Sequence, residues 1–244
     1  MTPVRAPIVD DSAAMRAALH HILSSDPEIE VVGTAPEPHA ARALIRELNP
    51  DVLTLDVEMP GMDGLSFLEK IMRLRPMPVV MCSSMTAHGT DVAIEAMRLG
   101  AVDCIAKPTG SPLAIRRDAA EICRAVKEAS RTHIRAHRRE PATPRIAHAR
   151  GKPRDTLIAI GASTGGVEAL FHILSRMPED SPPILIVQHM PEAFTDSFAR
   201  RLDKICKLTV REAQDGMPIA PGLAVVAPGT HRHMQLSGGT HGCV

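Results

Sequence analysis

The 244-residue sequence contains no tryptophan and no tyrosine, and only four phenylalanines. Aromatic stacking platforms of the kind that bind single-stranded nucleic acid are therefore not expected. Its 28 basic and 28 acidic residues cancel, so no net field draws the chain to nucleic acid or a membrane surface. No apolar run is long enough to span a bilayer, and no signal peptide is recognisable. These absences predict a cytoplasmic protein that is not membrane-embedded and does not bind nucleic acid.

Cysteine is scarce, and its spacing shows no pairs. The five cysteines fit neither a disulfide framework nor a zinc site; they are Cys82, Cys104, Cys123, Cys206 and Cys243. They are typical of a reduced, cytosolic protein. The cores must then be built from Leu, Ile, Val, Ala and Met.

Short apolar runs and amphipathic helical patterns alternate through the first half of the chain. The runs predict strands at residues 4–9, 29–32, 51–55, 78–82 and 102–106. Ser12 and Ser111 are expected to cap the first and last helices. This alternation predicts an α/β fold, a parallel sheet with helices on both faces. Pro7 is an anomaly in the first run, because proline cannot donate to a sheet ladder.

Polar residues follow four of these five strands. Asp10 and Asp11 follow the first strand, Asp56 the third, Ser83 the fourth and Lys107 the fifth. Ligands of such sheets bind beyond the carboxyl ends of the strands. Clustered carboxylates repel one another unless a cation lies among them, and oxygen ligands suit Mg²⁺. We interpret Asp56, the lone acid on the central strand, as a phosphoryl acceptor.

The segments IVDDS, LDVEMPGMDG, VVMCSS and AKP resemble a two-component receiver domain. The resemblance covers about residues 4–126 and implies a flavodoxin-like (βα)5 fold with a Mg²⁺-dependent aspartyl phosphate. It assigns six residues to that site: Asp10, Asp11 and Asp56 with the backbone carbonyl of Glu58 for the metal, and Ser83 and Lys107 for the switch and the phosphoryl group.

Two residues depart from the receiver pattern. Pro7 replaces an ordinary strand residue, and Cys104 stands where such domains usually carry an aromatic residue that reports phosphorylation. Both departures bear on the efficiency of the switch more than on the site itself.

Residues 128–154 are rich in Arg, His, Ala and Pro. Prolines end the helical pattern there and no apolar face persists. The segment is typical of a flexible, positively charged tether between two domains.

A serine stands at the turn between a strand and a helix in the second half. The apolar run of residues 157–160 leads through Gly161 to Ser163, and Gly165 and Gly166 precede the next helical pattern. Such a turn presents a hydroxyl for attack, with backbone N–H groups that could hold an oxyanion. It is equally compatible with a glycine-rich loop that binds phosphate at a helix start.

The next strand, residues 183–188, ends at His189, which lies one strand–helix–strand unit after Ser163. The carboxyl ends of two parallel neighbours lie side by side, so the two residues can come within hydrogen-bond reach as nucleophile and general base. Further strands are expected at residues 207–212 and 223–227, and HRHMQL at residues 231–236 is another candidate strand.

GASTGG, VQHMP and APGTHRHM, behind a receiver and a tether, resemble the chemotaxis protein-glutamate methylesterase (CheB) family. The implied domains are a receiver at 1–127, a linker at 128–154 and a parallel α/β methylesterase domain at 155–244. The resemblance implies a serine hydrolase that demethylates glutamates, and deamidates certain glutamines, of methyl-accepting chemoreceptors. It assigns Ser163 as nucleophile, His189 as base and Thr164 to the oxyanion region. A chemotaxis histidine kinase would phosphorylate Asp56, which would relieve inhibition by the receiver.

One departure from this family is large. Its triad is completed by an Asp in a glycine-rich motif resembling GMGxDG, and no such motif is present in this sequence. Asp196, Asp203 and Asp215 do not follow strands in the expected way, so they are interpreted as surface acids. We expect a catalytic domain that is incomplete at its C-terminus and a chain that is a poor esterase.

Two other functions are alternatives to this one. A receiver with an inactive or phosphate-binding output module would act by protein–protein interaction alone. A DNA-binding response regulator would carry a basic recognition helix, whereas this second half has strand–loop–helix patterns.

Overall fold

The computed structural model describes residues 2–59, 63–84, 86–108, 112–132, 134, 156–229 and 232–238. The chain divides into two compact units, one of residues 1–134 with 164–168 and the other of residues 135–163 with 169–244. Helix α5 (Pro112–Ser130) continues past residue 127, where the receiver was expected to end. Most of the expected tether lies outside the described residues, so the domain boundaries stay a prediction.

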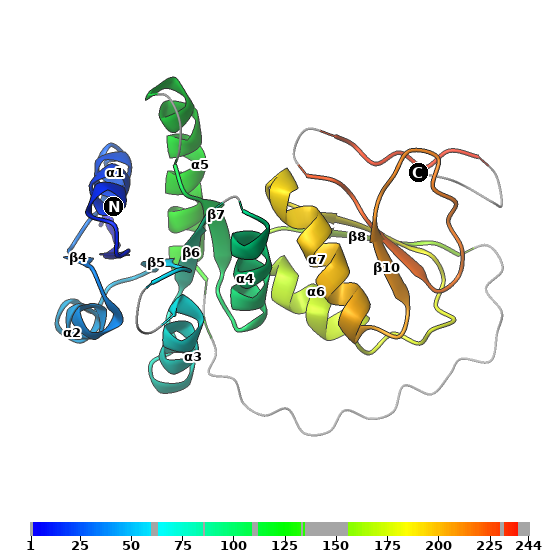
Figure 1. Ribbon diagram of the computed structural model, residues 1–244, viewed down its shortest axis with the longest axis horizontal. Coiled ribbons are helices and arrows are strands. Elements are labelled where there is room, and N and C mark those ends of the chain that lie inside the picture. Colours follow the sequence, from blue (N-terminus) through cyan, green and yellow to red (C-terminus); the bar gives the residue numbers. More distant parts are fainter. Residues whose placement is uncertain are drawn as a thin grey trace. The chain divides into compact units, whose positions relative to one another are not determined.

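The first unit is built on a five-stranded parallel sheet with the order β4-β2-β5-β6-β7. Its strands are β2 (Ile8–Val9), β4 (Thr34–Ala35), β5 (Leu53–Asp56), β6 (Val79–Ser83) and β7 (Asp103–Ala106). Helices α1 (Ala13–Ser24) and α5 pack together on one face, and α2 (Pro38–Leu48), α3 (Gly64–Leu74) and α4 (Ala87–Arg98) cover the other (Figure 1). The predicted flavodoxin-like receiver fold is confirmed.

The apolar periodicity of α1 and α5 accounts for the core on their face of the sheet. Leu19 and Leu23 of α1 pack with Ile122 and Val126 of α5 over the buried strand residue Ile8. Each such side chain contributes about 1.5–3 kcal/mol when it leaves water. The expected cap of α1 is confirmed, because the Ser12 hydroxyl accepts from the N–H of Met15 at 3.3 Å. Ser111, the expected cap of α5, lies outside the described residues.

The first strand is not continuous over residues 4–9 as predicted. It is interrupted at Ala6 and Pro7, and β1 (Val4–Arg5) pairs with β3 (Ile29–Glu30) in a separate two-stranded sheet. The sequence separation of paired residues is 25 for Val4 and Ile29 but 26 for Ile8 and Thr34. The second strand segment, which runs from β3 to β4, therefore carries one extra residue beside Pro7. Proline is tolerated at such bulges because the ladder is already broken there.

The second unit is a four-stranded parallel sheet with the order β10-β11-β9-β8. Its strands are β8 (Ile158–Ala162), β9 (Ile184–Gln188), β10 (Thr209–Glu212) and β11 (Leu223–Val226), all within two residues of the expected runs. Helices α6 (Gly166–Leu174) and α7 (Glu192–Ile205) meet through an edge-to-face contact of Phe171 and Phe198, whose centroids are 5.8 Å apart. The strand expected at residues 231–236 is wrong for 232–236, which form no strand; His231 is not among the described residues.

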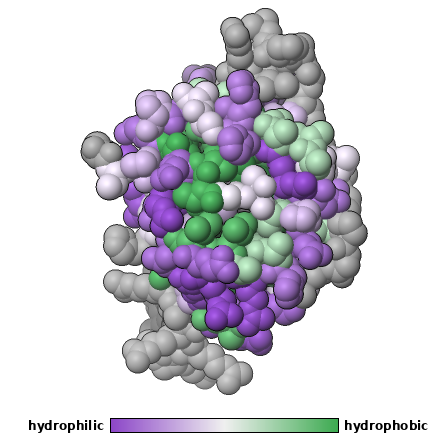
Figure 2. Space-filling model, turned by 90° about the vertical axis from the view of Figure 1, so that its left-hand side faces the viewer, coloured by the Kyte–Doolittle hydropathy of each residue, from purple (hydrophilic) through white to green (hydrophobic). Residues whose placement is uncertain are grey.

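Some apolar residues lie outside these cores. Val187 in β9 is 54% exposed and Leu157 before β8 is 37% exposed, although Ile186 beside Val187 is fully buried. On the first unit, apolar residues gather within a polar surround on the side where α1, α2 and the edge strand β4 lie (Figure 2).

None of the described helices is long and apolar enough to cross a membrane. The four cysteines within the described ranges are free thiols, and Cys82, Cys104 and Cys123 are buried.

Candidate functional site

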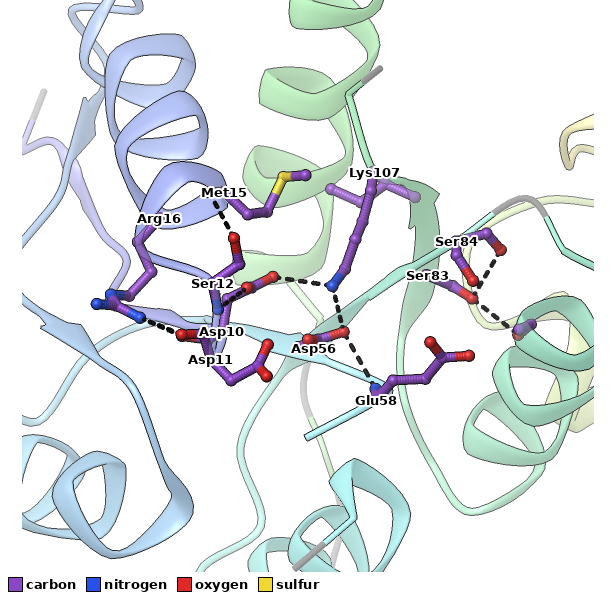
Figure 3. A network of polar contacts seen from close by, with 12 residues as sticks. Asp10, Asp11, Ser12, Met15, Arg16, Asp56, Glu58, Ser83, Ser84 and Lys107 are labelled. Atoms are coloured by element: carbon purple, nitrogen blue, oxygen red, sulfur yellow. Dashed lines mark hydrogen bonds and ion pairs between the residues drawn. The ribbon is translucent and has the colours of Figure 1, made fainter. Parts of the chain in front are cut away.

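Four charged residues meet at the carboxyl edge of the first sheet. Asp10 and Asp11 directly follow β2, Asp56 ends β5 and Lys107 follows β7 (Figure 3). One carboxylate oxygen from each aspartate lies within 4.8 Å of the others. Asp10 and Asp56 are fully buried, whereas Asp11 is exposed. The structure therefore brings together the acids and the lysine that the strand-end pattern predicted.

Lys107 neutralises part of this charge. Its Nζ lies 2.7 Å from Asp56 Oδ1 and 3.1 Å from Asp10 Oδ2. Burial raises the pKa of Asp56 above its ordinary value, and the hydrogen bond from Lys107 opposes this without cancelling it. Burial alone would lower the pKa of Lys107, but its bond to Asp56 and the two carboxylate charges raise it. One ammonium thus leaves the carboxylates short of positive charge.

The chain that follows β2 is held by Arg16, a residue that sequence reasoning missed. Its guanidinium donates to the carbonyl of Asp10 at 2.7 Å and to that of Asp11 at 3.0 Å, while the Ser12 N–H donates to Asp10 Oδ1 at 2.8 Å (Figure 3). The available signal was a cation one turn into the helix that follows an acidic pair. These bonds hold the backbone at both aspartates and fix where the Asp10 carboxylate points.

The loop after β5 is anchored on Asp56 itself. The backbone N–H of Glu58 donates to Asp56 Oδ1 at 3.1 Å (Figure 3). Gly64, the first residue of α3, lies so close that a Cβ there would be 2.2 Å from the Asp56 carbonyl oxygen. The assignment of the Glu58 carbonyl as a metal ligand stays a prediction.

The acidic cluster fits a divalent cation. Asp56 Oδ2 is buried and has no hydrogen-bond partner within the part of the chain described. A buried anionic oxygen without a partner is costly, and hard oxygen donors with one exposed side suit Mg²⁺. Asp10, Asp11 and Asp56 can therefore hold such an ion.

Ser83 lies at the expected strand end but is not in contact with the carboxylates. Its hydroxyl donates to the carbonyl of Gly89 in α4 at 2.8 Å and to that of Ser84 at 3.2 Å (Figure 3). A Cβ on Gly89 would come within 2.4 Å of the Ser84 hydroxyl. Ser83 thus links β6 to the first turn of α4, which is where a switch residue can act on a helix.

Cys104, which stands at the position of the expected aromatic residue, is buried in β7. Its thiol points to the carbonyl of Ile105, at 3.9 Å. Burial raises the pKa of this thiol, so it stays protonated at neutral pH. The side chain is short and has no ring that could report phosphorylation.

The second unit brings Ser163 and His189 together. β8 and β9 are parallel neighbours, and the His189 N–H continues their ladder to the carbonyl of Ala162 at 2.9 Å. Ser163 Oγ lies 3.5 Å from His189 Nδ1, and both residues are exposed. This separation is at the limit of a hydrogen bond, which is common for a catalytic pair without substrate.

The imidazole of His189 has no acidic partner among the described residues. Two of the acids interpreted as surface acids form ion pairs with arginines: Asp196 lies 3.3 Å from Arg200, and Asp203 lies 2.6 Å from Arg211. Thr164 is on the turn that follows Ser163, and its place in an oxyanion site stays a prediction.

A receiver unit followed by a second parallel α/β unit defines a response regulator with an output unit. Family models agree: "Response regulator receiver domain" matches residues 7–116 and "CheB methylesterase" matches residues 158–243.

Curated relatives give the particular family. A "Protein-glutamate methylesterase/protein-glutamine glutaminase" of Thiobacillus denitrificans is 50% identical over 96% of this chain and 67% of its own length, and one of Escherichia coli K12 is 50% identical over 97% and 68%. The solved receiver domain of Thermotoga maritima CheB is 42% identical, with a TM-score of 0.49, over 54% of this chain and 98% of that one. This chain belongs to the CheB family. It spans about two thirds of the length of these curated relatives.

Proposed function

We propose that this protein is a phosphorylation-regulated protein-glutamate methylesterase of chemotaxis. It removes methyl esters from glutamates of methyl-accepting chemoreceptors and deamidates certain of their glutamines. The observation that carries the proposal is the approach of Ser163 Oγ to His189 Nδ1 at 3.5 Å, at the carboxyl ends of adjacent strands. Membership of the CheB family supports the same chemistry.

The esterase reaction runs through a covalent intermediate. Ser163 Oγ attacks the ester carbonyl while His189 takes its proton, and backbone N–H groups near Thr164 stabilise the oxyanion. The tetrahedral adduct collapses, and methanol leaves with the proton from His189. Water, deprotonated by the same imidazole, then attacks the acyl carbonyl, the bond to Ser163 Oγ breaks, and Oγ takes the proton back from His189. The glutamate carboxylate is released. With an amide substrate the leaving group is ammonia.

The protein acts in the cytoplasm, and its first unit regulates this site. Asp56 accepts a phosphoryl group from a chemotaxis histidine kinase, and Lys107 and Ser83 bind the phosphoryl oxygens. Asp10, Asp11, Asp56 and the Glu58 carbonyl would hold a Mg²⁺ ion. When bound, the ion supplies the positive charge that Lys107 alone does not.

The 244-residue chain is proposed to be impaired as an esterase. A third triad member fixes the tautomer and orientation of the base, and His189 lacks an acidic partner in the described part of the chain. The same observation favours a second candidate, a receiver whose output unit acts only through protein–protein contacts.

Prolonged incubation with methylated chemoreceptor membranes tests the proposal. We expect slow methanol release that increases with acetyl phosphate and Mg²⁺, that Ser163→Ala or His189→Ala abolishes, and that Asp56→Asn makes insensitive to acetyl phosphate. The two active-site substitutions should be non-additive, because the groups act as one unit. Methanol release by Ser163→Ala equal to that of the wild type would favour the interaction-only candidate.

A further inference from the structure

A buried amide lies directly behind the Ser163–His189 pair. Gln188 is the last residue of β9 and is 6% exposed, although the strand is otherwise apolar. Its Nε2 donates to the backbone carbonyl of Ser163 at 2.9 Å and to that of His189 at 3.1 Å. A single side chain therefore binds the main chain of both residues.

These two bonds lie where the backbone ladder stops. The last bond between β8 and β9 runs from the His189 N–H to the carbonyl of Ala162 at 2.9 Å. The next carbonyl along the chain, that of Ser163, is bound by the Gln188 side chain. Past Ala162 the separation of the two strand ends thus depends on this amide.

We propose that Gln188 is a positioning residue of the esterase site. It does not touch the ester, but it holds the carbonyls of nucleophile and base and so sets the distance between their side chains. The inference rests on the proposed function of Ser163 and His189. With Oγ and Nδ1 already 3.5 Å apart, a small further displacement takes the pair out of hydrogen-bond range.

The carbonyl oxygen of the Gln188 amide supports this proposal. Gln188 Oε1 is buried and has no hydrogen-bond partner among the described residues. An unpaired buried carbonyl costs free energy, and methionine would fill similar space without that cost. The contribution of the amide therefore lies in its two N–H donors.

The test compares the 244-residue chain with Gln188→Met, which removes both donors. Its matched control is Ser181→Ala, because Ser181 is also buried and donates to a backbone carbonyl, that of Pro178 at 2.6 Å, but at the amino-terminal edge of the sheet. The measurements are the rate and pH profile of Ser163 labelling by a fluorophosphonate, and the NMR resonances of the His189 ring.

Folded Gln188→Met should label on the order of 10²-fold more slowly, as expected for a displacement of about 1 Å. Its pH profile and His189 resonances should shift, while Ser181→Ala stays within about twofold of the wild type. Labelling, pH profile and resonances all equal to the wild type in Gln188→Met would overturn the proposal. If that variant does not fold, Gln188→Asn, one methylene shorter, replaces it under the same criteria.

The same data separate this inference from the proposed function. If wild type and Ser163→Ala label alike, the nucleophile assignment fails. A displaced His189 ring in Gln188→Met would then still support the positioning role, and an unmoved ring would overturn it.

Discussion

At the scale of single residues, the receiver site depends on a glycine as well as on carboxylates. A Cβ at Gly64 would lie 2.2 Å from the Asp56 carbonyl oxygen and 2.9 Å from that of Val57, and backbone atoms cannot yield as a side chain can. We expect Gly64→Ala to lower the free energy of unfolding of the first unit by about 1–3 kcal/mol. Urea unfolding and hydrogen exchange of β5 measure this.

Gly33→Ala is the matched control for that substitution. The atoms nearest to a Cβ there would be side-chain carbons of Leu44 and Leu48, at 3.2–3.6 Å, which can move. Equal losses of stability in the two variants would show that the contact with the Asp56 backbone is not the cause.

At the scale of elements, one lysine joins α5 to the turn between α1 and β3. Lys127 Nζ lies 2.8 Å from Asp26 Oδ2 and 2.7 Å from Glu28 Oε2. The hydrogen bond from Lys127 is the main cause that lowers the pKa of Asp26, and its bonds to both acids raise the pKa of Lys127. The ion pair of Lys127 and Asp26 therefore stabilises the fold above the unfolded pKa of Asp and below the unfolded pKa of Lys, roughly between pH 4 and 10.

We expect Lys127→Met to reduce stability within that pH range. The difference from the wild type should shrink as pH falls through the folded pKa of Asp26, and again as pH rises through that of Lys127. Thermal unfolding across pH measures it, with Arg73→Met as the control because Arg73 has no ion pair in the described residues. A difference that does not change with pH would show that the lysine stabilises through packing.

At the scale of the whole molecule, we expect a competent receiver beside a weak esterase. His189 has no acidic partner among the described residues, and removal of the third triad member of serine proteases lowers kcat on the order of 10⁴-fold. Parallel sheets are usually covered on both faces, whereas Val187 is 54% exposed in β9. Hydrolysis of a small activated ester should thus be slow relative to a curated relative, while acetyl phosphate still modifies Asp56. Limited proteolysis should leave a core the size of the first unit.

A rate equal to that of the relative would contradict this prediction. It would show that the acidic third member of the triad is dispensable or that another residue takes its part. Cleavage of the first unit before the second would contradict the structural half of the argument.

The sequence by itself determined the order of the elements and the residues at the strand ends. Apolar runs that alternate with amphipathic patterns leave one parallel architecture, and such a sheet must bring Asp10, Asp56 and Lys107 to the same edge. The neighbouring positions of Ser163 and His189 follow from one strand–helix–strand step. These inferences succeed because they need only chain direction and periodicity.

Only the tertiary structure decided the contacts that hold these groups in place. No local pattern shows that the second strand carries an extra residue beside Pro7. The same is true of Gln188, which reaches across to Ser163, 25 residues earlier in the chain. Such contacts depend on how closely distant segments of the chain approach one another, and those distances exist only once the sheets are packed.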